Sequence, residues 1–271
     1  MTKAKILIVQ NAPVINQKEE NLKSVEKMLS RHAKERFDLI ILPELFAAGW
    51  HPESFVQNAE TIENSPTLDL LKETAKKFKS NVIGGSFVLK ENDNTYRNAC
   101  PFIDRNGNIL GMYYKMHLFS HFLYNEGKYI TNGEKGLLAN SDIGKIGISI
   151  CYDIRFPELF REYAYNGADL LVEVAAWPKY RQDHWKTLAR ARAIENQSFM
   201  IAVSQSGHIQ GDEWNLGHST VIAPYGEIIC ETGFDACTKI VEIDLNEARK
   251  LKKDFNILKD RQPLPYTVKE I

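Results

Sequence analysis

Short apolar runs alternate with stretches of helical spacing along most of this 271-residue chain. The apolar runs predict strands at 6–9, 39–42, 82–89, 98–104, 109–114, 145–150, 170–174, 199–204, 219–223, 227–230 and 239–243. Helical spacing predicts helices over 17–36, 66–79 and 183–197, and from about 246 onward. Alternation of this kind is typical of an α/β domain.

Two hairpin signals restrict the possible arrangements of the strands further. Asn106-Gly107 lies between two of the predicted strands, and Pro224-Tyr225-Gly226 lies between another two. Antiparallel hairpins combined with crossover helices favour a mixed sheet, or two sheets, over a purely parallel one. No low-complexity linker and no internal repeat divides the chain, so we expect residues 1–271 to form one domain.

The composition is that of an ordinary globular protein, with 44% apolar and 25% charged residues. A formal net charge of -1 argues against nucleic acid or an anionic membrane as a partner. No apolar run approaches the ~18 residues that a membrane span needs, and the first apolar run is too short for a signal peptide. The four cysteines show no Cys-x-x-Cys pair and no zinc-ligand spacing. We therefore expect a cytoplasmic protein with reduced thiols, and no metal or organic cofactor.

Cys151 ends the apolar run that begins at Gly147. A cysteine at the carboxyl end of a buried strand lies where ligands bind in open α/β sheets. The turn that follows would offer backbone amides to a developing oxyanion, so one short segment supplies both a nucleophile and its stabiliser. The ordinary alternative is a small buried hydrophobic residue, which is what most free cysteines are.

Three further charged residues follow strand-like runs or lie in turn-rich loops. Glu44 comes directly after an apolar run and Pro43, Lys115 follows the run 109–114, and Glu126 lies in a loop. Each taken singly is compatible with an ordinary surface charge. Together with Cys151 they can carry out acyl transfer on an amide without a histidine: the thiolate attacks, Glu44 moves the proton, and Lys115 with the backbone amide of Tyr152 stabilises the oxyanion. Glu126 would hold Lys115 or a substrate amine.

His117 and His121 are the alternative partners for the thiol. A cysteine–histidine mechanism needs a third orienting residue, which the sequence does not identify. We expect both histidines to be structural.

Several segments together resemble the nitrilase superfamily of carbon–nitrogen hydrolases. Leu42-Pro43-Glu44, Tyr114 to Leu118 and Gly147 to Glu158 resemble its three catalytic blocks. Further similar segments are Ala176-Trp177-Pro178, His184-Trp185, 191–197 and the tail from Asp260 to Tyr266. The resemblance covers nearly the whole chain.

The resemblance implies a four-layer α-β-β-α sandwich, homodimers joined through an outer helical layer, and a catalytic triad of Glu44, Lys115 and Cys151. It also implies a supporting role for Glu126. The block from Cys151 to Glu158 is most similar to the omega-amidase branch, whose members act on monoamides of 2-oxo dicarboxylic acids such as 2-oxoglutaramate.

Such a substrate carries a carboxylate and needs a cation in the pocket. Arg181 is the first candidate. Arg155 is the second, and we expect it to pair internally with Asp153 or Glu158.

Other predicted pocket residues follow from the same resemblance. Where many relatives carry an asparagine, this chain reads 203–207 as Val-Ser-Gln-Ser-Gly, so Gln205 or Ser204 would replace that contact. Trp177 is a further substrate-binding candidate. The region of Trp50, His51 and Phe122 would either line the pocket or provide ordinary loop packing.

Alternative functions remain open at this point. An N-carbamoyl-amine hydrolase, a deaminated-glutathione amidase and a nitrilase would use the same triad. A thiol redox sensor and a non-catalytic binding protein are more remote. An α/β-hydrolase with a cysteine nucleophile is disfavoured, because Ser149 and Asp153 stand where that fold needs glycines.

Overall fold

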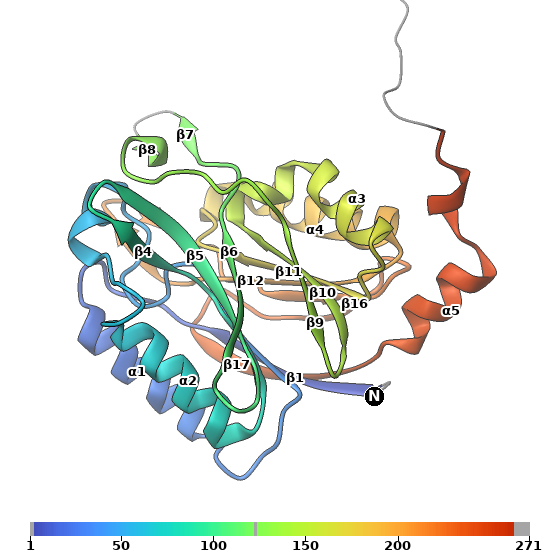
Figure 1. Ribbon diagram of the computed structural model, residues 1–271, viewed down its shortest axis with the longest axis horizontal. Helices are drawn as coiled ribbons and strands as arrows, with labels where there is room; N and C mark the ends of the chain where they lie inside the picture. Colours follow the sequence, from blue (N-terminus) through green and yellow to red (C-terminus); the bar gives the residue numbers. More distant parts are fainter. Residues whose placement is uncertain (1–2, 122–123, 263–271) are drawn as a thin grey trace, which may run out of the picture.

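Two mixed β-sheets stack against each other in the computed structural model, which describes residues 3–121 and 124–262 (Figure 1). The first sheet has the order β17-β1-β2-β3-β5-β4, with β6 paired to β5. Its strands are β1 (Lys3–Gln10), β2 (Leu39–Leu42), β3 (Asn81–Gly84), β4 (Phe87–Asn92), β5 (Thr95–Ile103), β6 (Ile109–Tyr114) and β17 (Cys237–Asp244). Its central strands β1, β2 and β3 are parallel, and the other strand pairs are antiparallel.

The second sheet has the order β16-β15-β12-β11-β10-β9. Its strands are β9 (Leu137–Ser141), β10 (Gly144–Ile150), β11 (Leu170–Ala175), β12 (Phe199–Ser204), β15 (Thr220–Ile222) and β16 (Ile228–Glu231). Strands β10, β11 and β12 form its parallel centre. Two short hairpins stand apart from both sheets: β7 (Ser120–His121) with β8 (Tyr124–Asn125), and β13 (His208–Gln210) with β14 (Glu213–Trp214).

Helices cover the outer face of each sheet (Figure 1). Helices α1 (Lys18–Ser30) and α2 (Pro66–Phe78) bury apolar residues such as Val25 and Leu71 in one core cluster with strands β1 and β2. Helices α3 (Pro157–Tyr165) and α4 (Gln182–Asn196) pack on the second sheet, where the ring of Tyr163 covers Gly147 of β10. Helix α5 (Asn246–Asp254) follows β17. The apolar inner faces of the two sheets meet between these layers, which makes a four-layer α-β-β-α sandwich as the resemblance implied.

Most predicted elements are present, two of them differ, and two observed elements were not predicted. The strand predicted over 82–89 is wrong, because Gly85 adopts a φ of +60° and divides it into β3 and β4. The helix predicted over 17–36 ends at Ser30, where turns replace it. Strand β9 and helix α3 were not predicted, since their apolar residues are few or lie inside the block around Cys151. Both predicted hairpins are confirmed as the pairs β5–β6 and β15–β16.

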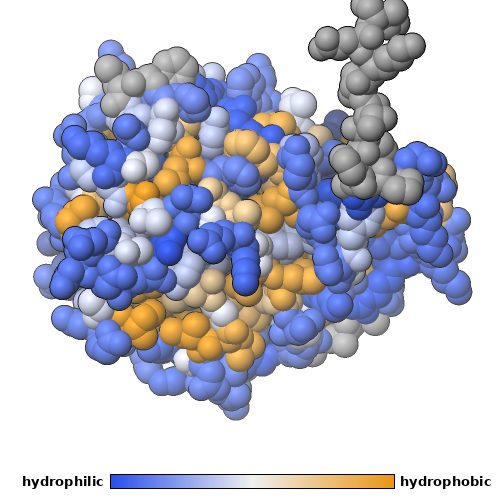
Figure 2. All heavy atoms as spheres, turned by 45° about the horizontal axis from the view of Figure 1, so that its top comes forward, coloured by the Kyte–Doolittle hydropathy of each residue, from blue (hydrophilic) through white to orange (hydrophobic). Residues whose placement is uncertain are grey.

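The face that Figure 2 shows is mainly hydrophilic, with separate apolar patches. Among the described residues, no helix is both long and apolar enough to cross a bilayer.

Candidate active site

Cys151 lies at a sharp change of backbone direction. Strand β10 ends at Ile150, Cys151 has a φ of +52°, and a short 3-10 helix (Cys151–Arg155) begins there. A positive φ is uncommon for a residue with a side chain. The buried carboxylate of Asp153 stabilises this turn, because it accepts hydrogen bonds from the amide of Ile150 at 2.9 Å and from the hydroxyl of Tyr113 at 2.7 Å. The turn presents the cysteine at the carboxyl end of the second sheet.

Glu44 follows β2 and is completely buried. Its Oε1 accepts hydrogen bonds from Lys115 Nζ at 2.9 Å and Asn98 Nδ2 at 2.8 Å, and its Oε2 accepts one from the amide of Ala176 at 2.9 Å. Gly85 lies against the chain just before Glu44, where an added Cβ would come within 2.1 Å of the carbonyl oxygen of Pro43. The glycine therefore permits the close packing that holds this loop.

Lys115 bridges two carboxylates. Its Nζ lies 2.9 Å from Glu44 Oε1 and 2.9 Å from each carboxylate oxygen of Glu126, and all three side chains are shielded from solvent. Glu126 also accepts a hydrogen bond from the amide of Phe119 at 2.7 Å. An ammonium group between two buried carboxylates has its position determined by short, charge-assisted bonds.

Ala176 connects the cysteine to this charged cluster. The sulfur of Cys151 lies 4.0 Å from the carbonyl oxygen of Ala176, whose amide donates a hydrogen bond to Glu44. Within the cluster, Asn98 Nδ2 joins the two carboxylates, since it donates to Glu44 at 2.8 Å and lies 3.4 Å from Glu126. The structure thus brings together Glu44, Lys115, Glu126 and Cys151, which are far apart in the sequence.

Burial and charge set the protonation of these groups. Burial raises the pKa of the Cys151 thiol well above its usual value, and the Glu44 carboxylate adds to this effect. Burial by itself would lower the pKa of Lys115, but the carboxylates of Glu126 and Glu44 outweigh it and hold this pKa well above its usual value. The resting site therefore contains a neutral thiol and a charged ammonium group.

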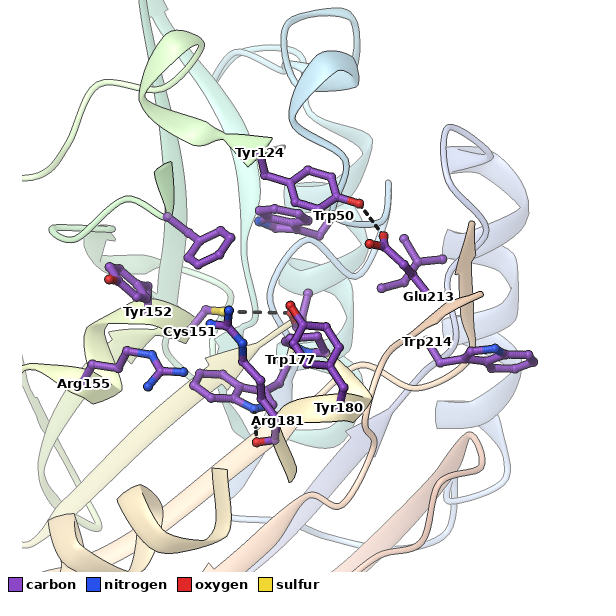
Figure 3. Close-up of a pocket in the computed structure, with 14 residues that line it drawn as sticks. Trp50, Tyr124, Cys151, Tyr152, Arg155, Trp177, Tyr180, Arg181, Glu213 and Trp214 are labelled. Carbon is purple, nitrogen blue, oxygen red and sulfur yellow. Dashed lines mark hydrogen bonds between the residues drawn. The ribbon is translucent and has the colours of Figure 1, made fainter. Parts of the chain in front are cut away.

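A mainly aromatic cavity opens above Cys151, with a volume of about 670 Å³ that includes its open mouth (Figure 3). Two of the three residues predicted to bind substrate, Trp177 and Arg181, line it. Trp50 and Tyr152 do so as well. The remaining described lining residues are Phe119, Tyr124, Arg155, Ala176, Pro178, Tyr180, Ile209, Glu213 and Trp214.

Two guanidinium groups belong to this wall. Arg155 lies over the ring of Trp177 at 4.9 Å, and Arg181 lies over the ring of Phe119 at 5.6 Å. Burial lowers the pKa of Arg155, and the nearby charge of Arg181 lowers it further. The expected internal ion pair of Arg155 is wrong: its hydrogen-bond partner is His184 Nδ1 at 3.2 Å, and no described carboxylate lies within ion-pair distance. Asp153 is instead engaged by Tyr113, His117 and the backbone of Ile150.

Other predicted residues lie away from the cavity. His117 donates its backbone amide to Asp153 and stacks on Phe156 at 3.6 Å, while His121 contacts the hydroxyl of Tyr152 at 3.1 Å. Gln205 is buried behind the cavity wall, where its Nε2 donates to the backbone oxygen of Glu44 at 2.6 Å. His51 lines a neighbouring cavity.

Phe122 lies outside the described residues, as do the last four residues of the closing segment that ends at Tyr266. Within the described ranges, no group of three or more His, Cys, Asp or Glu side chains is placed to hold a metal ion.

Several residues of the site carry no local sequence signal. Asn98 lies inside β5, and Tyr124 and Glu213 lie on short hairpins. Only the tertiary structure places them beside Glu44 or in the cavity wall.

Known proteins are similar to this chain in sequence and in fold. The family model described as carbon–nitrogen hydrolase matches residues 5–253. The 2-oxoglutaramate amidase of Bacillus subtilis is 35% identical over 89% of this chain and 91% of its own length. Omega-amidase NIT2-B of Xenopus laevis is 31% identical over 100% of this chain and 99% of its own.

A solved structure agrees with these relatives. Nit3 of Saccharomyces cerevisiae, a member of branch 10 of the nitrilase superfamily, superimposes with a TM-score of 0.86 at 28% identity, over 94% of this chain and 95% of that one. This chain therefore belongs to the carbon–nitrogen hydrolase family of the nitrilase superfamily and is an amidase.

Proposed function

We propose that this enzyme is an omega-amidase, which hydrolyses the terminal amide of a 2-oxo dicarboxylic acid monoamide to a carboxylate and ammonia. The observation that carries the proposal is the combination of a buried Glu44–Lys115–Cys151 site with two arginines in one cavity wall. The names of the relatives in Bacillus and Xenopus support the same substrate class.

The chemistry begins with a neutral thiol, because the raised pKa of Cys151 leaves it protonated at rest. Glu44 accepts the thiol proton while the sulfur attacks the amide carbon. The oxyanion of the tetrahedral intermediate is stabilised by the Lys115 ammonium group and the backbone amide of Tyr152. Glu44 then gives its proton to the amide nitrogen, the carbon–nitrogen bond breaks, and ammonia leaves a thioester on Cys151.

Water completes the reaction. Glu44 removes a proton from a water molecule, whose oxygen attacks the thioester carbon. The carbon–sulfur bond breaks, the acid product leaves, and the sulfur regains its proton from Glu44. Glu126 keeps the Lys115 ammonium group charged and in place throughout, through the two 2.9 Å contacts.

Arg181 and Arg155 are the proposed carboxylate ligands. A guanidinium group can bind a carboxylate through two parallel hydrogen bonds. Arg155 has no carboxylate partner among the described residues, so a substrate carboxylate would relieve the repulsion between the two cations. Trp177 supplies the flat apolar surface beside them.

Ammonia release from 2-oxoglutaramate tests this function. Glutamine, an N-carbamoyl amine, deaminated glutathione and a simple nitrile are run in parallel, with Cys151→Ala as the control for covalent catalysis. Turnover of 2-oxoglutaramate above the others, lost in the variant, is the expected result. Preference for another member of the panel would keep the triad chemistry and overturn the substrate, and activity retained in Cys151→Ala would overturn the mechanism.

A further inference from the structure

Two short hairpins meet at the side of the cavity opposite Arg155 (Figure 3). The hydroxyl of Tyr124, on β8, donates a hydrogen bond to Glu213 Oε2 on β14 and accepts one from Gln210 Nε2 on β13 at 3.2 Å. Burial and the nearby Glu213 raise the pKa of Tyr124 to about 12, so this hydroxyl keeps its proton at neutral pH. The Tyr124–Glu213 contact joins residues 89 positions apart and closes this side of the cavity.

Tyr124 is also a wall between two cavities. Tyr124 lines the cavity above Cys151. It also lines an outer cavity, together with His51, Lys128 and Gln210. The ring of Trp50 packs edge-on against that of Tyr124 at 5.1 Å, which holds the tyrosine ring in position. Removing this ring would join the outer cavity to the catalytic one.

Charge is distributed unevenly around the catalytic cavity. Glu213 is the one acidic side chain among the described residues that line it, and Arg155 and Arg181 are the two cationic ones. With the substrate carboxylate at the arginines and the amide carbon at Cys151, we take a substituent on the leaving nitrogen to extend toward Tyr124 and Glu213, while the nitrogen itself stays within reach of Glu44. An extension of that nitrogen would meet the tyrosine ring, and a carboxylate on the extension would meet the negative charge of Glu213.

We propose that Tyr124 and Glu213 are specificity-determining residues that restrict this site to primary amides. They exclude amides whose leaving amine is an amino acid or peptide, the ring by its volume and the carboxylate by repulsion. This inference rests on the proposed function, since it assumes that the substrate carboxylate binds at the arginine wall.

The test compares kcat/KM for three amides of the same acyl group. They are 2-oxoglutaramate, its N-methyl amide, and the amide that 2-oxoglutarate forms through its C5 carboxyl group with glycine. We expect Tyr124→Ala to raise kcat/KM for both substituted amides, relative to 2-oxoglutaramate, at least tenfold. Glu213→Gln is close in shape and removes only the charge, so it should raise the relative value severalfold for the glycine amide and leave the N-methyl amide unchanged.

Tyr180→Ala is the matched control. Tyr180 is an aromatic residue that lines the same cavity, is 73% exposed, and is not part of the Tyr124–Glu213 hydrogen bond. Its removal should change all three substrates in parallel. Ratios that stay unchanged in folded Tyr124→Ala and Glu213→Gln would overturn the inference, as would an equal shift of the ratios in Tyr180→Ala.

Two further measurements cover the cases in which Tyr124→Ala does not fold or the wild-type enzyme does not hydrolyse 2-oxoglutaramate. If Tyr124→Ala does not fold, Tyr124→Phe keeps the ring and removes the hydroxyl that holds Glu213, and it should shift the glycine-amide ratio in the same direction. If the wild-type enzyme does not hydrolyse 2-oxoglutaramate, the proposed function fails. The inference is then judged separately, from the same ratios measured on whichever primary amide the enzyme accepts and on its N-methyl and N-carboxymethyl derivatives.

Discussion

At the scale of single residues, the Glu44 carboxylate accepts three hydrogen bonds, which hold it in one position, and we propose that it transfers protons at Cys151 from there. Glu44→Gln is nearly isosteric but cannot accept a proton, so we expect kcat to fall about 10²-fold or more. Steady-state kinetics on the purified variant, with circular dichroism to show that it is folded, checks this prediction. A loss below threefold would remove Glu44 from the mechanism.

Glu173 is a second buried carboxyl group near the site, and its hydrogen bonds indicate that it is neutral. The hydroxyl of Ser149 lies 2.5 Å from Glu173 Oε2 and 3.1 Å from the backbone oxygen of Val172. One hydroxyl proton cannot serve both acceptors, whereas a protonated Glu173 can donate to Ser149 while Ser149 donates to Val172. Burial, reinforced by the charge of Asp153, raises the pKa of Glu173 well above its usual value in agreement with this.

A neutral Glu173 predicts a pH-dependent stability. Above the usual carboxyl pKa the unfolded chain releases this proton and the folded chain keeps it, so the group destabilises the fold increasingly as pH rises. Replacing Glu173 by Gln removes this loss. The free energy of unfolding of Glu173→Gln minus that of the wild type should therefore increase by about 1.4 kcal/mol per pH unit between pH 5 and 7. Urea unfolding at pH 5, 6 and 7 measures it, and a pH-independent difference would show that Glu173 is ionised.

At the scale of elements, the positions where strands end are what local sequence patterns predict best. β2, β6 and β12 were predicted residue for residue, because each is a nearly continuous apolar run bounded by polar residues or, after β2, by Pro43. Glu44, Lys115 and Cys151 could be predicted as candidate site residues for the same reason, since each lies at or just after the end of an apolar run. The division of β3 from β4 depends on the backbone conformation of Gly85, and the hairpins β7–β8 and β13–β14 depend on contacts with distant segments, so local patterns did not predict them.

Helix α5 is attached to the second sheet by a partly desolvated lysine. Lys252 Nζ donates to the backbone oxygen of Ala168 at 2.6 Å and to Ser198 Oγ at 2.9 Å, and burial lowers its pKa to about 8. In the unfolded chain the pKa returns to about 10.4. Between these values the unfolded state binds the proton more than the folded state does, so the contribution of Lys252 to stability rises with pH.

Comparison with Lys252→Met isolates this effect. The free energy of unfolding of the wild type, relative to the variant, should increase by about 1.4 kcal/mol per pH unit from pH 8 to 10 and stay level below pH 7. Denaturant titrations of both proteins across this pH range measure the difference. Other groups that titrate at alkaline pH affect both proteins equally, so their contributions cancel. A difference that does not change between pH 8 and 10 would mean that Lys252 keeps its ordinary pKa in the folded protein.

At the scale of the whole molecule, the site exists because two sheets bring their strand ends together. Glu44 and Lys115 follow strands of the first sheet, Cys151 follows a strand of the second, and Glu126 lies in the connection between them. Strand patterns predicted the strands but contain no information on how the two sheets stack. The family resemblance supplied that arrangement, and it could not supply contacts such as Asn98 with Glu44 or Tyr124 with Glu213.

The outer helical layer predicts how two copies would associate. Ile194 on α4 is 45% exposed, and Gly226 of the β15–β16 turn lies against it, with Tyr225 and Ile228 exposed by 73% and 46% beside that glycine in the chain. We propose that these apolar side chains form part of a homodimer interface, so Ile194→Glu should convert a particle of twice 31.0 kDa into one of 31.0 kDa. Light scattering after size-exclusion chromatography measures the mass. Leu110→Glu is the control, because Leu110 is 54% exposed on β6 of the other sheet and should leave the dimer intact. A wild-type mass of 31.0 kDa, or an unchanged dimer in Ile194→Glu, would contradict this interface.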